Sequence, residues 1–180
     1  MSMLALEVNR LREGEERLER LVQPPELPPE EDYRVVEPVA LSVRMTRAKS
    51  KVGLVGSART VLELVCGRCL EPYRIPVDAE FDLLYLPFVE APAGGEELEI
   101  AEEDVNTAFY KEGLIDLGEM LHEQLYLALP MKPLCRETCL GLCPVCGANR
   151  NTHPCACEPQ WEDPRLAALK ALLKDDDTHA

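Results

Sequence analysis

The sequence predicts an α+β protein, in which an antiparallel β-sheet or partial barrel with a long hairpin carries one packed helix, a C-terminal zinc-knuckle module and a terminal helix. Three observations predict this class. Apolar residues recur at every second position over residues 52–66 and again over 73–85, which is typical of two paired strands. One amphipathic stretch over residues 116–129 is typical of a helix that covers a sheet. Six of the eight cysteines lie between residues 135 and 157, which favours a module held together by metal.

The chain is expected to form two domains and a tail. The first is an α+β core over residues 1–130, with Cys66 and Cys69 at the tip of its hairpin. The second is a cysteine-rich zinc-binding module with a C-terminal helix over residues 131–174, and residues 175–180 form a disordered tail. A chain of 180 residues can bury one hydrophobic core, whereas a module of about 40 residues usually needs metal to compensate for a small core.

The N-terminal third predicts strands separated by a proline-rich connector. Apolar residues alternate over residues 4–8 and over 39–45, as expected for two strands. Residues 15–21, EERLERL, are ambiguous, because their propensities are helical but the segment is short. The four prolines of residues 24–32 predict an extended, exposed connector.

A basic turn follows the strand at residues 39–45. Arg44, Arg47, Lys49 and Lys51 lie within eight residues that contain no acid. This is the one local cluster where a phosphate could dock, so these four residues are candidate RNA contacts. The alternative is a solvated turn with no ligand.

The alternating segments 52–66 and 73–85 predict a long β-hairpin whose tip is the sequence Cys66-Gly-Arg-Cys69. Such a tip presents two thiols at the end of a rigid ribbon. Gly56 interrupts the side chains of the first strand and marks either a bulge or a close approach of backbones.

An acidic segment and then a helix follow the hairpin. Residues 87–104 contain seven acids and no base, which predicts a mobile linker rather than a catalytic site. Asp116 and Glu119 resemble a capping box, and Pro130 ends the helix. The expected buried face consists of Leu117, Leu121, Leu125 and Ala128. We interpret His122 as a partly exposed helical histidine rather than a ligand.

The C-terminal region predicts a second helix. Asp163 is suited to the N-cap with Pro164 at the first helical position, and leucines form an apolar stripe over residues 166–173. The stripe needs a partner, which is either the rest of this chain or a groove on another protein.

The cysteine spacings are C-x2-C at Cys66 and Cys69, followed by C-x3-C-x3-C-x2-C-x8-C-x-C from Cys135 to Cys157. Eight thiols suit two tetrahedral sites, and Gly147 supplies the permissive φ that a turn after Cys146 needs. The N-terminus lacks the pattern of a secretory signal, and no apolar run is long enough to cross a membrane. We therefore expect a cytoplasmic protein, in which paired cysteines bind zinc, two ions per chain, more readily than they form disulfides.

An iron–sulfur cluster is the main alternative to zinc. Cys139, Cys143 and Cys146 have the spacing C-x3-C-x2-C of the radical SAM enzymes. Those enzymes need most of an α/β barrel around the cluster, and this chain shows no series of alternating strands and helices. Three other cysteines of the same region would also have no role.

The net charge of the chain limits the kinds of partner that it can bind. The formal net charge is -14, and an acidic protein binds nucleic acid poorly because non-specific affinity depends on basic residues that neutralise phosphates. A basic partner is the more natural inference. The alternative is that the charge only keeps the protein soluble.

The sequence favours a non-enzymatic protein. Four-thiolate sites have no open coordination position, and the sequence contains no phosphate loop, nucleophile motif or evident small-molecule site. The alternative is an enzyme, either an iron–sulfur or thiol redox enzyme or a metal-dependent hydrolase. In the hydrolase, His153 would replace Cys155 or Cys157 as a ligand.

The combined motifs resemble the YceD family, the large ribosomal RNA subunit accumulation proteins. They are the Cys-x-x-Cys after an alternating strand, the Ile-Asp-Leu helix ending in Leu-Ala-Leu-Pro, the knuckle CLGLCPVCGANRN with Cys-x-Cys after it, and the terminal DPRLAALK. The resemblance covers residues 54–174. It implies a bacterial cytosolic protein that supports accumulation of the large-subunit ribosomal RNA and ribosome biogenesis, with that RNA or a basic ribosomal protein as its partner.

The resemblance also bears on which cysteines share a metal. Members of the family vary in how much of the knuckle they retain, which implies that one site is built without it. Sequence proximity and the hairpin then favour one site at Cys66, Cys69, Cys135 and Cys139, and a second at Cys143, Cys146, Cys155 and Cys157. A rival assignment places the four cysteines from Cys135 to Cys146 on one ion.

Overall fold

The computed structural model describes residues 4–88 and 106–158. Within these ranges, residues 4–67, 71–88 and 106–135 form a larger unit, and residues 68–70 and 136–158 form a smaller one. Of the expected elements, most of the acidic segment 87–104, the helix over residues 163–174 and the tail 175–180 lie outside the described residues. Among the residues described, no helix combines the length and the apolarity that crossing a membrane requires.

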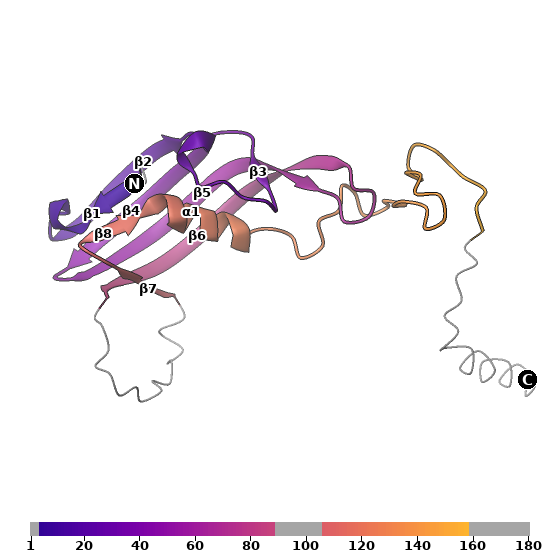
Figure 1. Cartoon of the computed structure of the whole chain (residues 1–180). Helices are drawn as coiled ribbons and strands as arrows, with labels where there is room; N and C mark the ends of the chain where they lie inside the picture. Colours follow the sequence, from indigo (N-terminus) through magenta and orange to yellow (C-terminus); the bar gives the residue numbers. More distant parts are fainter. Residues whose placement is uncertain (1–3, 89–105, 159–180) are drawn as a thin grey trace, which may run out of the picture. The chain divides into compact units, whose positions relative to one another are not determined.

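The larger unit is built on a six-stranded sheet, visible in Figure 1. Its strands are β2 (Gly14–Val22), β4 (Val39–Ala48), β5 (Lys51–Val65), β6 (Pro72–Pro87) and β7 (Thr107–Tyr110), in that order, with β3 (Arg34–Val35) paired to β5. All pairs are antiparallel except β6 with β7, which is parallel. Because β2 and β7 stay at opposite ends of the path, the sheet of the described residues does not close into a barrel.

The long hairpin is confirmed as the pair β5 and β6, which stay in register from Val52 opposite Tyr85 to Val65 opposite Pro72. Strand β2 resolves the ambiguity at residues 15–21. All nine of its residues pair with β4, and this cross-strand pairing outweighs the helical propensity of the segment. Strand β2 lies at an edge and is mostly exposed, which explains why its sequence shows little alternation.

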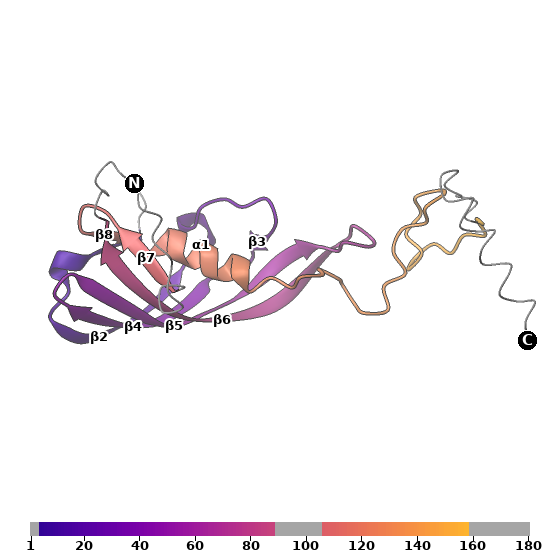
Figure 2. The same ribbon diagram turned by 90° about the horizontal axis from the view of Figure 1, so that it is seen from below.

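One helix, α1 (Leu117–Leu127), packs on one face of the sheet, as Figures 1 and 2 both show. Asp116 caps it, since its Oδ1 accepts hydrogen bonds from the backbone N–H of Gly118 at 2.8 Å and of Glu119 at 3.2 Å. Burial is confirmed for the three leucines of the predicted face. The prediction is wrong for Ala128, which is the exposed C-cap residue. Met120 is buried in its place.

A small second sheet fixes the start of α1. Strands β1 (Ala5–Glu7) and β8 (Leu114–Asp116) pair antiparallel, and the N–H of Leu117 donates to the carbonyl of Leu4 at 2.9 Å. A short 3₁₀ turn, η1 (Val8–Arg10), follows β1. Strands β3, β7 and β8 were not predicted, because two to four residues are too few to show a period.

The proline-rich connector is less extended than the sequence predicts. It contains a 3₁₀ turn, η2 (Pro24–Glu26), and its end is attached to α1. The hydroxyl of the buried Tyr33 lies 3.0 Å from Nδ1 of His122, and Glu30 lies 3.0 Å from Nε2 of the same ring. Burial, with Glu30 nearby, raises the pKa of Tyr33 to about 12. His122 therefore holds the connector against the helix.

Gly56 marks a close approach of backbones rather than a bulge. Strands β4 and β5 pair without interruption from Ala40 to Ala48. A Cβ atom at Gly56 would lie 2.8 Å from the Cα of Val43, and closer still to the carbonyl oxygen of Ser42. Only glycine fits at this point of the sheet without moving the neighbouring strand.

Candidate metal centres

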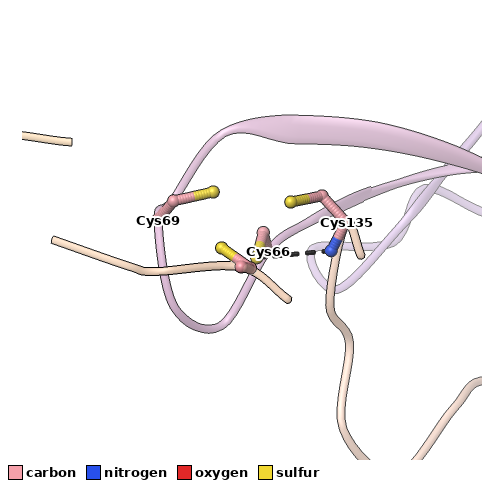
Figure 3. Close-up of side chains that lie close together, drawn as sticks. Cys66, Cys69 and Cys135 are labelled. Atoms are coloured by element: carbon pink, nitrogen blue, oxygen red, sulfur yellow. Dashed lines mark hydrogen bonds between the residues drawn. The ribbon is translucent and has the colours of Figure 1, made fainter. Parts of the chain in front are cut away.

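The tip of the hairpin is held by hydrogen bonds between backbones. The N–H of Cys66 donates to the carbonyl of Glu71 at 3.0 Å, which closes the turn. The N–H of Gly67 donates to the carbonyl of Pro133 at 2.7 Å, so the chain that leaves α1 runs past the tip. The N–H of Cys135 then donates to Sγ of Cys66 at 3.4 Å, shown as the dashed line in Figure 3.

The first cluster consists of four sulfur atoms that all lie within 4.8 Å of one another: Cys66, Cys69, Cys135 and Cys139. Figure 3 shows Cys66, Cys69 and Cys135 with their sulfurs turned toward a common centre. Zinc binds thiolates at about 2.3 Å, which puts tetrahedral sulfurs about 3.8 Å apart, so the cluster fits one such ion. Three of its cysteines are at least 96% buried, as expected of a closed structural site.

Cys139 is brought to its place by Arg68, the third residue of the hairpin tip. Its guanidinium donates to the carbonyl of Cys139 at 3.0 Å, and its own carbonyl accepts the N–H of Leu142 at 3.0 Å. Both contacts lie in the smaller unit. Arg68 thus holds the backbone at Cys139 and at Leu142, on the two sides of Leu140. These contacts set the direction in which the Cys139 sulfur points.

The second cluster is formed by Cys143, Cys146, Cys155 and Cys157, whose sulfurs also lie within 4.8 Å of one another. The turn that joins the first two is a knuckle, in which the N–H of Gly147 donates to the carbonyl of Cys143 at 2.9 Å. Gly147 has φ of 72°, as the sequence predicts for this position. Only Cys143 is buried, so this cluster lies far closer to solvent than the first.

The electrostatics of the second cluster suit a cation. The backbone N–H groups of Cys146 and Val145 lower the pKa of the Cys143 thiol to about 6. The pKa of the Cys157 thiol is raised to about 12, chiefly because Cys157 shares a hydrogen bond with the side chain of Cys146. When four thiols lie this close, ionisation of one makes ionisation of the others less favourable, because the thiolates repel one another. A bound divalent ion would let all four ionise.

Both clusters contain the residues that the sequence analysis assigns to them, and His153 belongs to neither. Nδ1 of His153 instead lies 2.9 Å from the hydroxyl of Thr152. If zinc binds, the first four cysteines would hold one ion and the last four the other. Each ion would cross-link segments that share little hydrophobic core.

A residue that the sequence analysis did not single out supports the first cluster. The side-chain N–H of Asn151 donates to Sγ of Cys139 at 3.4 Å, while its Oδ1 accepts the N–H of Leu140 at 3.0 Å and the guanidinium of Arg136 at 2.8 Å. Oδ1 of Asn149 accepts hydrogen bonds from the backbone N–H of Asn151 at 3.0 Å and from its side-chain N–H at 2.9 Å. The two asparagines, spaced two apart after a cysteine turn, were the available signal for this support.

Asn151→Ala is expected to weaken metal binding at the first cluster by roughly 10-fold to 100-fold, as is typical when a group that orients a ligand is removed. The reason is that Cys139 loses its side-chain hydrogen-bond donor and Leu140 its acceptor. Zinc release to a chromogenic chelator would measure the effect. Thr152→Ala, next in the chain, is the control, because the Thr152 hydroxyl contacts the carbonyl of Asn149 and the ring of His153 rather than a sulfur. Equal release rates for both variants would contradict the role given to Asn151.

The basic turn does not form a single patch in the structure. Arg44 and Arg47 are three apart in β4, so their side chains point to opposite faces of the sheet. Arg44 lies 3.5 Å from Glu15, and Arg47 donates to the carbonyls of Leu11 at 2.7 Å and Lys49 at 3.0 Å. Contact of these residues with RNA stays a prediction.

Comparisons with known proteins give the chain a family. The family model described as large ribosomal RNA subunit accumulation protein YceD matches residues 54–173. The chain is 33% identical over 161 residues to the large ribosomal RNA subunit accumulation protein YCED homolog 1, chloroplastic, of Zea mays, covering 76% of this chain and 54% of that protein. For the Arabidopsis thaliana protein of the same name, identity is 30% over 166 residues, with 78% and 50% covered.

An uncharacterized protein of Mycobacterium tuberculosis is 30% identical over 137 residues, covering 74% of this chain and 61% of that protein. The chain thus spans about half the length of the plant relatives that it matches. No solved structure matches it. The family model covers most of the hairpin, all of α1 and every cysteine of both clusters, and on this basis the chain belongs to the YceD family.

Proposed function

We propose that this chain is a non-enzymatic factor that supports accumulation of the large-subunit ribosomal RNA during ribosome biogenesis. Its two zinc centres would shape a surface that binds that RNA or a ribosomal protein. The name of the family and of its plant relatives describes RNA accumulation rather than a reaction. We also propose that the chain acts in the bacterial cytoplasm. Its two domains would be a core over residues 1–130 and a metal-binding module over residues 131–174.

The convergence of four sulfurs at each cluster is the observation that carries the non-enzymatic part of the proposal. A metal held by four thiolates has no position left for water or substrate, which is typical of structural rather than catalytic zinc. The ions would then stabilise the hairpin tip and the knuckle.

The proposal is tested in a bacterium that carries this gene. Deleting the gene is expected to lower the ratio of large-subunit to small-subunit ribosomal RNA, measured by electrophoresis of total RNA. The wild-type gene should restore the ratio, and a variant with serine at all four cysteines of the first cluster should not. An unchanged ratio in the deletion strain, under conditions of rapid growth, would refute the proposed function.

A further inference from the structure

An apolar groove lies in the larger unit, between the C-terminal end of α1 and the end of β5. It has a volume of about 540 Å³, and its walls include Leu64, Val65, Tyr126, Leu127 and Met131. Leu127 is 76% exposed, and Met131, in the chain that leaves the helix, is 99% exposed. Several large apolar side chains gathered at one concave place are typical of a surface that binds a partner.

Two of these side chains, Tyr126 and Leu127, are exposed at the C-terminal end of α1. Its buried face ends at Leu125, and Tyr126 and Leu127 follow on the outer side of the same turn. Fully burying one leucine or methionine side chain contributes about 1.5 to 3 kcal/mol. Even partial cover over Leu127 and Met131 would therefore favour association with an apolar group.

Charge at the groove selects among partners. Glu31 and Asp32 are part of its lining, which contains no basic residue. Within the described ranges, neither carboxylate has a cationic partner. A phosphate would be repelled here, and the net charge of the chain, -14, adds to that repulsion. A lysine or arginine would instead be attracted.

We propose that this groove binds a basic amphipathic segment of a protein of the large ribosomal subunit. An apolar side chain of that segment lies between Leu127 and Met131, and a neighbouring lysine or arginine faces Glu31 and Asp32. This inference rests on the proposed function and assigns the direct contact at this surface to protein rather than RNA.

The groove lies next to cysteines of the first cluster, so a metal bound there would help to hold its walls together. One wall, Leu64 and Val65, leads directly into Cys66, and the other reaches Cys135 two residues after Pro133. Two hydrogen bonds join the walls. The N–H of Gly67 donates to the carbonyl of Pro133 at 2.7 Å, and the N–H of Cys135 donates to Sγ of Cys66 at 3.4 Å. If a metal binds at this cluster, its removal is therefore expected to let the walls separate and to weaken binding of the partner.

The test uses the full chain with the photo-cross-linking residue p-benzoylphenylalanine at position 127. It is incubated, in separate samples, with the protein fraction of purified large ribosomal subunits and with protein-free large-subunit RNA. The expected result is a cross-link to one protein, at a segment where apolar residues alternate with lysine or arginine. The same cross-linker at position 21, an exposed leucine on β2, is the control and should give no such product.

Affinity for the cross-linked protein then tests the contacts. The double variant Leu127→Ser, Met131→Ser is expected to bind it at least about 10-fold more weakly, and Glu31→Lys, Asp32→Lys likewise, while Leu21→Ser should bind normally. All these side chains are exposed or at the rim, so the variants should unfold at the temperature of the wild type.

Several outcomes would overturn the assignment: a cross-link to RNA, to a second copy or to this chain itself, no cross-link, or unchanged affinity in both double variants. If these occur while deletion of the gene still lowers the ratio of ribosomal RNAs, the groove inference fails and the proposed function stands. If deletion has no effect, the proposed function fails instead.

Discussion

Cys66→Ser is expected, if each cluster binds one zinc ion as proposed, to remove one of the two ions and to lower the free energy of unfolding by roughly 4 kcal/mol. Loss of a structural metal is among the most damaging single changes. Cys66 is completely buried, lies at the tip of the longest hairpin and accepts the N–H of Cys135. Its loss should therefore separate the tip from the chain that follows α1. Elemental analysis and thermal unfolding measure the two effects.

Cys155→Ser is the matched control, since Cys155 is an exposed member of the second cluster. It should also lose one zinc ion, yet leave the unfolding temperature of the core nearly unchanged. Equal losses of stability in the two variants, or the loss of both ions in either variant, would count against two separate sites. If the wild-type protein contains iron and shows a broad absorbance band near about 400 nm, the sites hold an iron–sulfur cluster and the assignment of zinc is wrong.

Gly56→Ala is expected to cost about 3 kcal/mol, at the upper end of what overpacking usually costs. The added Cβ would meet the backbone of β4 at Ser42 and Val43, which can move only if the sheet opens. For a domain of this size the unfolding temperature should fall by roughly 10 °C.

Gly53→Ala tests whether backbone contact is the reason for that cost. It lies on the same strand, but its Cβ would meet the Thr46 hydroxyl at 2.6 Å, and this side chain can rotate away. It should cost less than about 1 kcal/mol, because alanine also restricts the unfolded chain. Urea unfolding would compare the two variants, and similar costs would disprove the close approach at Gly56.

The sequence was most informative where a period extends over many residues. The hairpin of β5 and β6 and the buried leucines of α1 repeat their patterns often enough to be recognised. Strand β7 could not be predicted, because it is four residues long and its place beside β6 depends on partners distant in the chain. The alternation over residues 4–8 did predict β1, but its pairing with β8 joins residues more than a hundred apart and could not be predicted.

The candidate sites divide in the same way. The number of cysteines suggested two sets of four, while the membership of each set came from the family resemblance, sequence proximity and the hairpin. The structure gathers the sulfurs in those sets, although metal binding itself stays a prediction. The supporting role of Asn151 depends on a loop geometry that no pattern encodes. The groove depends on Leu127 and Met131 being left uncovered by the sheet, which can be seen only in three dimensions.

The pairing of β1 with β8 has a consequence for synthesis on the ribosome. Ala5 pairs with Asp116, so the first strand leaves the ribosome long before its partner is translated. At synthesis rates of about 5–20 residues per second, the delay is roughly 5 to 20 seconds. Throughout this interval the backbone of β1 lacks the pairing with β8 that it has in the finished fold. The small sheet that fixes the start of α1 is thus completed only after β8 has emerged, among the last of the described strands to be translated.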